Sequence, residues 1–169
     1  MTSEYSSVAV LLAAHNGMMW LEEQIESILS QKSILVKIFI SVDFSNDKTY
    51  DWCQNLAKKN TRVNVLPYGN TFGGAAKNFF HLIQNVDLLG FDYISLADQD
   101  DIWNDEKLHY AIETIKREDL DGYSSNVIAF WSNGRKKLVK KSFPQKKFDY
   151  YFEAAGPGCT YVFKQQAIQ

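Results

Sequence analysis

Short apolar runs alternate along this chain with stretches whose apolar side chains recur at helical spacing, and this alternation strongly constrains the fold. The apolar runs are residues 8–13, 36–42, 63–66 and 91–97, and the second of them is rich in β-branched side chains. After the last run, the apolar residues of 108–115 recur three or four positions apart. Strands that alternate with helices form a parallel sheet covered on both faces. We therefore expect an α/β fold with a mostly parallel central sheet.

A polar segment follows each of the four apolar runs. These segments are residues 14–17, 43–47, 67–70 and 98–101. In a parallel sheet, the loops that leave the carboxyl ends of the strands gather on one edge, where ligands bind. The sequence therefore predicts that all four polar segments contribute to one site. With 169 residues and 46% hydrophobic content, the chain is long enough for one domain with a real core.

The segment Asp98-Gln99-Asp100-Asp101 follows the apolar run directly and gathers three carboxylates in four residues. Such carboxylates repel one another, and a hard divalent cation converts that repulsion into binding. Mg²⁺ and Mn²⁺ favour oxygen ligands of this kind, with the phosphates of a substrate filling the remaining positions. Acidic tetrapeptides also occur in solvated turns, but the position after a buried strand favours a metal site.

Four ordered segments of the chain resemble the family 2 glycosyltransferases, whose nucleotide-binding α/β domain has the Rossmann-like GT-A fold. Residues 12–31 are similar to the opening strand and helix of the family, and residues 41–49 to its D-D-G-S-x-D-x-T segment. Residues 70–78 are similar to its N-x-G-x-x-x-x-R-N segment. The form D-Q-D-D-I-W at residues 98–103 is most similar to the rhamnosyltransferase-like branch. The resemblance spans about residues 8–168 of the chain.

The resemblance implies an inverting glycosyltransferase that moves a sugar from a nucleotide-diphosphate donor, with deoxythymidine-diphosphate (dTDP) rhamnose suggested by the branch. The acceptor would be a glycan or a lipid-linked glycan in surface polysaccharide synthesis. The implied metal is Mg²⁺ or Mn²⁺, held by Asp100 with help from Asp98. The implied nucleotide-sugar contacts are Ala13, His15, Asn16, Asp43, Lys77, Asp98 and Gln99.

The sequence departs from the family pattern at several positions beside these contacts. Val42 and Phe44 replace the usual aspartate and glycine around Asp43, so the loop after the second strand is expected to sit differently. Lys77 replaces the commoner arginine, which keeps the charge but loses bidentate phosphate geometry. We also expect Asp47 to cap the helix that follows it, and Trp103 to form a wall of the cleft rather than to take part in the chemistry.

The resemblance divides the single domain, residues 1–169, into a nucleotide-sugar-binding half at 1–103 and the start of an acceptor-side half at 104–169, which is expected to be incomplete. Inversion requires a carboxylate that deprotonates the acceptor hydroxyl. That base is expected after a strand at 159–163, in a segment beyond Gln169. Glu153 lies outside the matching motif. We therefore expect this polypeptide to bind a nucleotide but to turn over poorly or not at all.

Two other functions stay open from the sequence. The first is a truncated, catalytically inactive domain that only binds a nucleotide. The second is a metal-dependent nucleotidyltransferase, although residues 14–17 lack the glycine-rich basic loop that grips a triphosphate. The net charge of −2 gives no electrostatic footprint for nucleic acid. Cys53 and Cys159 show neither zinc spacing nor a disulfide framework, which favours a reducing cytoplasm.

Basic residues are concentrated in one segment, 135–147, which holds seven of the 18 lysines and arginines. One interpretation is a solvated hairpin on the acceptor-side half. The other is peripheral contact with an anionic membrane at its inner face, where each nearby Lys or Arg is worth about 1 kcal/mol. A membrane contact would suit an enzyme whose acceptor is linked to a lipid.

Overall fold

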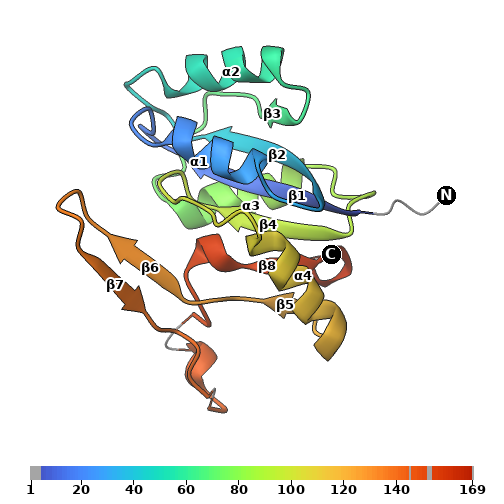
Figure 1. The fold of residues 1–169 in the computed structure, drawn as a ribbon. Helices are drawn as coiled ribbons and strands as arrows, with labels where there is room; N and C mark the ends of the chain where they lie inside the picture. The colour runs from blue at the N-terminus through green and yellow to red at the C-terminus, as the bar shows by residue number, and fades with distance from the viewer. Residues whose placement is uncertain (1–4, 145, 152–153, 169) are drawn as a thin grey trace.

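The computed structural model describes residues 5–144, 146–151 and 154–168, and its centre is a six-stranded sheet of order β3-β2-β1-β4-β8-β5 (Figure 1). The central strand β1 (Ser6–Ala14) pairs in parallel with β2 (Ile34–Val42) and with β4 (Tyr93–Ala97). Strand β3 (Val63–Val65) pairs in parallel with β2. Strand β8 (Val162–Lys164) is antiparallel to β4 and to β5 (Gly122–Tyr123). The expected α/β fold with a mostly parallel sheet is confirmed.

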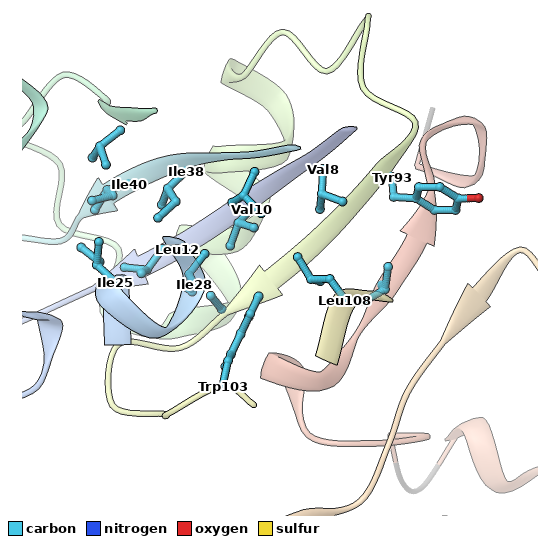
Figure 2. Packing of buried hydrophobic residues seen from close by; sticks show 14 of the residues in the cluster. Val8, Val10, Leu12, Ile25, Ile28, Ile38, Ile40, Tyr93, Trp103 and Leu108 are labelled. Atoms are coloured by element: carbon cyan, nitrogen blue, oxygen red, sulfur yellow. The ribbon is translucent and has the colours of Figure 1, made fainter. Parts of the chain in front are cut away.

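Helices cover both faces of the sheet because the side chains of β1 alternate between two apolar clusters. Val8, Val10 and Leu12 pack in one cluster with residues of α1 (Leu21–Leu29), α2 (Thr49–Lys59) and α4 (Lys107–Glu118), as Figure 2 shows in part. Ala9, Leu11 and Ala13 pack in the other cluster with residues of α3 (Ala75–Asn85). A strand buried on both faces reads as a continuous apolar run, which is the pattern of residues 8–13.

The segment at 159–163 differs from the strand that the sequence predicts. A short 3₁₀ helix, η2 (Gly158–Thr160), comes first, and only Val162–Lys164 form a strand. Thr160 donates its backbone N–H and its hydroxyl to the carbonyl of Pro157, at 3.0 and 2.8 Å. This turn shortens β8 and brings Cys159 beside the end of β4. Two further 3₁₀ turns are η1 (Asp149–Tyr151) and η3 (Gln165–Ala167).

A two-stranded sheet of β6 (Val127–Phe130) and β7 (Lys136–Val139) forms a separate hairpin. Figure 1 shows this hairpin projecting away from the central sheet. Arg135 lies in the turn between β6 and β7. The basic segment 135–147 therefore begins in a hairpin, as the first of its two interpretations expects. Among the described residues, no helix is both long enough and apolar enough to cross a lipid bilayer.

Helix α2 begins one residue later than the sequence predicts. Lys48 occupies the N-cap position and makes no side-chain cap bond. The carboxylate of Asp47 nevertheless accepts the backbone N–H of Thr49 at 2.9 Å and that of Met18 at 3.3 Å. Asp47 therefore satisfies a first-turn N–H of α2 and also fixes the loop that follows β1.

Candidate functional site

A cavity of about 540 Å³ opens at the carboxyl ends of β1, β2 and β4, and we call it the edge cavity. Its lining residues come from four segments of the chain, 13–15, 43–44, 71–78 and 98–100. Three of these overlap the polar segments that the sequence places at this edge. The third strand contributes differently, because the loop after it reaches the cavity through residues 71–78 rather than 67–70.

Most of the predicted contact residues line the edge cavity. Those that do are Ala13, His15, Asp43, Asp98, Gln99 and Asp100. Asn16 and Lys77 are not among the lining residues: Lys77 is exposed on α3, and Asn16 supports the neighbouring loop. The side-chain oxygen of Asn16 accepts the backbone N–H of Asn46 at 2.9 Å. The backbone N–H of Asn16 donates to Ser45 Oγ at 3.0 Å.

Gln99 joins the loop after β4 to the loop after β1. Its Oε1 accepts the backbone N–H of His15 at 2.7 Å, and its Nε2 donates to the carbonyl of His15 at 2.9 Å. Gly17 leaves room for this pair, because a Cβ at that position would lie 2.6 Å from Gln99 Oε1. The reciprocal pair gives Gln99 a positioning role that holds two walls of the edge cavity together.

Asp43 fixes the loop before α3, which forms a further wall of the edge cavity. Its buried carboxylate accepts backbone N–H groups from Phe44 and Phe72 at 2.8 Å each and from Gly73 at 3.0 Å. Burial acts to raise the pKa of Asp43, but these three hydrogen bonds outweigh it and hold the pKa below its ordinary value. Asp43 is therefore a charged anchor for the loop that leads into α3, and it still faces the edge cavity.

Phe44 lines the edge cavity, and a second aromatic ring supports it. Its side chain is 57% exposed and stacks on Tyr68, with ring centroids 6.5 Å apart and an interplanar angle of 14°. Tyr68 stacks in turn on Tyr50 at 4.3 Å. A supported aromatic ring beside a carboxylate suits a flat, polar-edged ligand such as a nucleobase.

The amino-terminal end of α3 forms another side of the cavity. Gly73, Gly74 and Ala75 line it, and Gly73 has φ 69°, a left-handed conformation that glycine adopts without strain. The first turn of a helix offers unpaired N–H groups and a favourable dipole for an anion. Asn78, one turn later, donates Nδ2 to the carbonyl of Ser41 at 3.0 Å, while its buried Oδ1 has no hydrogen-bond partner in the described part of the chain.

Asn78 is a site residue that the sequence reasoning missed. It stood in the matched segment 70–78, but its type alone did not separate a structural amide from a ligand-facing one. In the structure the amide nitrogen of Asn78 fixes α3 to β2, while its amide oxygen, beside the cavity, has no hydrogen-bond partner among the described residues.

The acidic segment gathers around Cys159. Ligand atoms of Asp98, Asp101 and Cys159 all lie within 4.8 Å of one another. Burial, reinforced by the neighbouring Asp101 and Asp100 carboxylates, raises the pKa of Asp98 to about 6. Burial likewise raises the pKa of Asp101, against a hydrogen bond from the Cys159 thiol. A desolvated, mutually repelling group of carboxylates fits a hard divalent cation, which would stabilise its ionised form.

Asp98 belongs to two groups of side chains, each of which could bind a metal ion. With Asp100 it lines the edge cavity, as the sequence predicts, and with Asp101 and Cys159 it forms the compact group. The signal for Asp101 was present in the acidic string. Cys159 had no signal in the sequence, since only the turn at η2 brings it to this place. Burial raises the pKa of the Cys159 thiol, so the neutral thiol is a poor ligand for Mg²⁺ or Mn²⁺.

Polar side chains on one side of α1 form hydrogen bonds to the backbone of the acidic segment 98–101 and of Trp103. Gln24, which is fully buried, donates Nε2 to the carbonyl of Asp98 at 2.9 Å. Ser27 accepts the backbone N–H of Trp103 at 3.0 Å. These residues are three positions apart and therefore face the same way on the helix. The sequence reasoning used only the apolar side chains of this helix and missed these polar ones.

Gln31, two residues beyond the end of α1, makes contacts of the same kind, and its loss is expected to destabilise the fold. It donates Nε2 to the carbonyl of Asn104 at 2.7 Å and accepts the N–H of Leu108 at 2.9 Å. A Gln31→Leu variant leaves the N–H of Leu108 unpaired, at a cost of about 1–3 kcal/mol, and removes one of the two hydrogen bonds to the Asn104 carbonyl, which keeps the N–H of Lys107. Urea unfolding should show a lower midpoint than a Ser30→Ala control, which removes only the exposed hydrogen bond from Ser30, just beyond α1, to the carbonyl of Ser27. Equal midpoints would contradict this role of Gln31.

The sheet order and the position of the edge cavity are those of an open α/β domain, which binds ligands beyond the carboxyl ends of its strands. The sequence profile of glycosyl transferase family 2 matches residues 9–165, and the chain belongs to this family.

Comparison with curated proteins agrees with this assignment. The chain is 49% identical over 158 residues to the dTDP-rhamnosyl transferase RfbG of Shigella flexneri, covering 93% of the chain and 55% of that protein. It is 27% identical over 115 residues to the glycosyltransferase GlyG of Streptococcus pneumoniae serotype 4, covering 68% of the chain and 36% of that protein. The chain thus spans about half of the first relative and about a third of the second.

Solved structures show the same fold. S. aureus TarS in complex with UDP-GlcNAc superposes with a TM-score of 0.68 at 17% identity, over 94% of this chain and 45% of TarS. The mannosyltransferase PcManGT from Pyrobaculum calidifontis, in complex with GDP-Man and Mn²⁺, superposes with a TM-score of 0.65 at 14% identity, over 94% of this chain and 44% of that protein. The fold is therefore the GT-A fold.

Proposed function

We propose that the chain is the donor-binding part of a glycosyltransferase that moves a sugar from a nucleoside diphosphate to a glycan or lipid-linked acceptor in surface polysaccharide synthesis. One observation carries the proposal: the edge cavity joins an aromatic and carboxylate wall, the start of a helix and a pair of aspartates. These features match a base, a diphosphate and a divalent cation in turn. The 49% identity to a dTDP-rhamnosyl transferase supports dTDP-rhamnose as the donor.

In this proposal each wall of the edge cavity holds one part of the donor. The nucleobase stacks on Phe44 and meets Asp43, while His15 and Ala13 lie against the ribose. The diphosphate lies at the N–H groups of Gly74 and Ala75, where the helix dipole favours negative charge. Lys77, exposed on the first turns of α3, adds positive charge near that end of the helix.

Asp98 and Asp100 would hold Mg²⁺ or Mn²⁺, which neutralises the diphosphate as the glycosidic bond breaks. Gln24 and Gln99 position these carboxylates by fixing the backbone at residues 98 and 15. The Mn²⁺ in the PcManGT complex supports a divalent cation for this fold.

In an inverting transfer, the acceptor oxygen bonds to the anomeric carbon as the bond from that carbon to the diphosphate oxygen breaks. The acceptor proton must pass to a base. Asp43 is a poor candidate because three backbone N–H groups already engage its carboxylate. Glu153 lies outside the described residues.

Calorimetric titration of the purified chain with dTDP, UDP and GDP, with and without Mn²⁺, tests the proposal. We expect at least one diphosphate to bind, more tightly with Mn²⁺ than without it. The preferred nucleotide identifies the base that the cavity accepts. If a protein shown to be folded by circular dichroism binds none of the three, the proposed function is wrong.

A Phe44→Ala variant is expected to weaken nucleotide binding about 10- to 100-fold, since stacking of a base on an aromatic ring is worth about 1–3 kcal/mol. The matched control is Phe80→Ala, which removes an exposed phenylalanine of α3 that does not line the cavity. Equal affinities of the two variants in the same titration would exclude a stacking role for Phe44.

We also propose that the basic segment 135–147 contacts an anionic membrane at its cytoplasmic face. Basic and aromatic side chains are interleaved there: Arg135 lies over the ring of Trp131 and Lys140 over that of Phe143, each at 5.0 Å. Trp131 and Phe143 are both exposed. Cationic and aromatic side chains together suit the boundary between lipid head groups and acyl chains.

Co-sedimentation with liposomes that contain phosphatidylserine tests the membrane contact. We expect salt-sensitive binding, and a Lys137→Gln/Lys140→Gln variant should bind about 30-fold more weakly at low salt, from about 1 kcal/mol for each charge. The control Lys58→Gln/Lys59→Gln removes the same charge from exposed positions of α2. Equal losses in both variants, or no binding at low salt, would exclude the hairpin as the contact.

A further inference from the structure

Three aromatic rings stack in a row from the edge cavity to the interior of the protein. The exposed ring of Phe44 lines the cavity and stacks on Tyr68, which stacks in turn on Tyr50 at an interplanar angle of 19°. Neither tyrosine lines the cavity, and both pack against the apolar cluster on the α1 side of the sheet. The stack therefore connects one exposed ring at the cavity to the core of the domain.

The hydroxyl of Tyr68 also holds the backbone beside Phe44. It accepts the backbone N–H of Ser45 at 2.9 Å and donates to the carbonyl of the same residue at 3.2 Å. A phenol hydroxyl can make both bonds, because it carries one donor hydrogen and acceptor lone pairs. Ser45 directly follows Phe44, so these bonds fix the backbone that carries the exposed ring.

Further hydrogen bonds hold the same backbone from its other side. The N–H of Phe44 lies 2.8 Å from the Asp43 carboxylate and 3.1 Å from the carbonyl of Asn70, and Ser45 Oγ donates to the carbonyl of Asp43 at 2.8 Å. The freedom left to Phe44 is rotation of its side chain, which the ring of Tyr68 restrains. A side chain ordered before a ligand arrives avoids the free-energy cost of ordering it on binding.

Tyr68 also explains how the polar segment 67–70 takes part in the site. The sequence predicts that this segment contributes to the edge of the sheet, yet none of its residues lines the edge cavity. Tyr68 reaches the site indirectly, through the ring of Phe44 and the backbone of Ser45.

We propose that Tyr68 is a positioning residue for nucleobase binding, which holds the ring of Phe44 in the orientation that a base stacks on. This inference rests on the proposed function, because it requires a nucleoside diphosphate in the edge cavity. Every base has a face that can stack, so a supported ring favours nucleotides as a class over a bare diphosphate. The choice among bases is left to groups at the edge of the base, such as Asp43.

Calorimetry with Mn²⁺ tests this role by comparing the nucleoside diphosphate that binds best with pyrophosphate, which has no base. A Tyr68→Leu variant is expected to bind the nucleotide about tenfold more weakly and pyrophosphate within about twofold of the wild type. A Tyr68→Phe variant keeps the stacked ring and loses only the hydroxyl, so we expect a smaller loss of about threefold. The control Tyr110→Leu removes an exposed tyrosine of α4 that does not line the edge cavity.

A double-mutant cycle shows whether Tyr68 acts through Phe44. In a Phe44→Ala background, Tyr68→Leu should cost less than about twofold in nucleotide affinity, since the ring that it positions is already gone. The same cycle with Tyr68→Phe decides the question if circular dichroism shows that Tyr68→Leu does not fold. Additive losses, an equal loss of pyrophosphate affinity, or a loss no greater than in Tyr110→Leu would overturn this inference alone. A folded wild type that binds no nucleoside diphosphate would overturn the proposed function as well.

Discussion

An Asp98→Asn variant is expected to lose the Mn²⁺-dependent part of nucleoside-diphosphate binding, with an affinity lower by roughly a hundredfold or more. Asparagine keeps the size of the side chain but removes the negative charge that a hard cation needs. Losing one partner of a buried charge pair costs about 2–5 kcal/mol. Calorimetry with and without Mn²⁺ measures the loss directly. An Asp121→Asn variant provides the control, because Asp121 is exposed and does not line the edge cavity.

The same titration distinguishes the two possible ligand groups around Asp98. A greater loss for Asp100→Asn than for Asp101→Asn would support the pair that the sequence predicts. The reverse order would place the ion in the compact group with Asp101 and Cys159. If Asp98→Asn itself retains the full Mn²⁺ dependence, the acidic segment does not bind the metal.

An Asp43→Ala variant is expected to lose about 3 kcal/mol of folding free energy and to bind nucleotide poorly. Three backbone N–H groups lose a charged acceptor, and each such bond contributes about 1.5–3 kcal/mol before the loop relaxes toward solvent. The segment that leads into α3 then loses its tie to β2. Urea unfolding measures the stability, and an Asp51→Asn variant of the exposed first turn of α2 is the control.

The contribution of Asp43 should also depend on pH in a defined direction. Its pKa in the folded protein lies below the ordinary value of 3.8, so its stabilisation is present above pH 3.8 and is lost as the pH falls through the folded pKa. An Asp43→Asn variant has no such titration and should lose less stability on acidification than the wild type. Parallel stability curves for the two proteins would contradict the charged-anchor role.

Much of the fold could be predicted from the sequence because β1 is buried on both faces. Its continuous apolar run distinguishes a central parallel strand from an alternating edge strand, and four such runs separated by helical stretches leave few topologies. The convergence of Asp43, Gln99 and Asp100 follows from topology alone, since loops at one edge of a sheet must meet. For this reason the edge cavity was predictable without side-chain detail.

The remaining features depend on contacts between distant segments. The position of Cys159 depends on a 3₁₀ turn that the apolar run 159–163 conceals. The role of Gln24 was hidden because a polar residue in an amphipathic helix is normally read as solvent-facing, whereas this one is fully buried. Lys77 was assigned to the donor by its place in a motif, but its side chain is exposed and is not a lining residue.

The turn η2 lies against the acidic segment at the end of β4, and this contact limits how either can be changed. A Cβ built at Gly158 would lie 3.7 Å from the Asp98 carboxylate, an ordinary van der Waals distance, and the Cys159 sulfur lies within 4.8 Å of the carboxylate oxygens of Asp98 and Asp101. A bulky substitution in η2 therefore changes the surroundings of both carboxylates, and engineering of the edge cavity is better directed to its other walls.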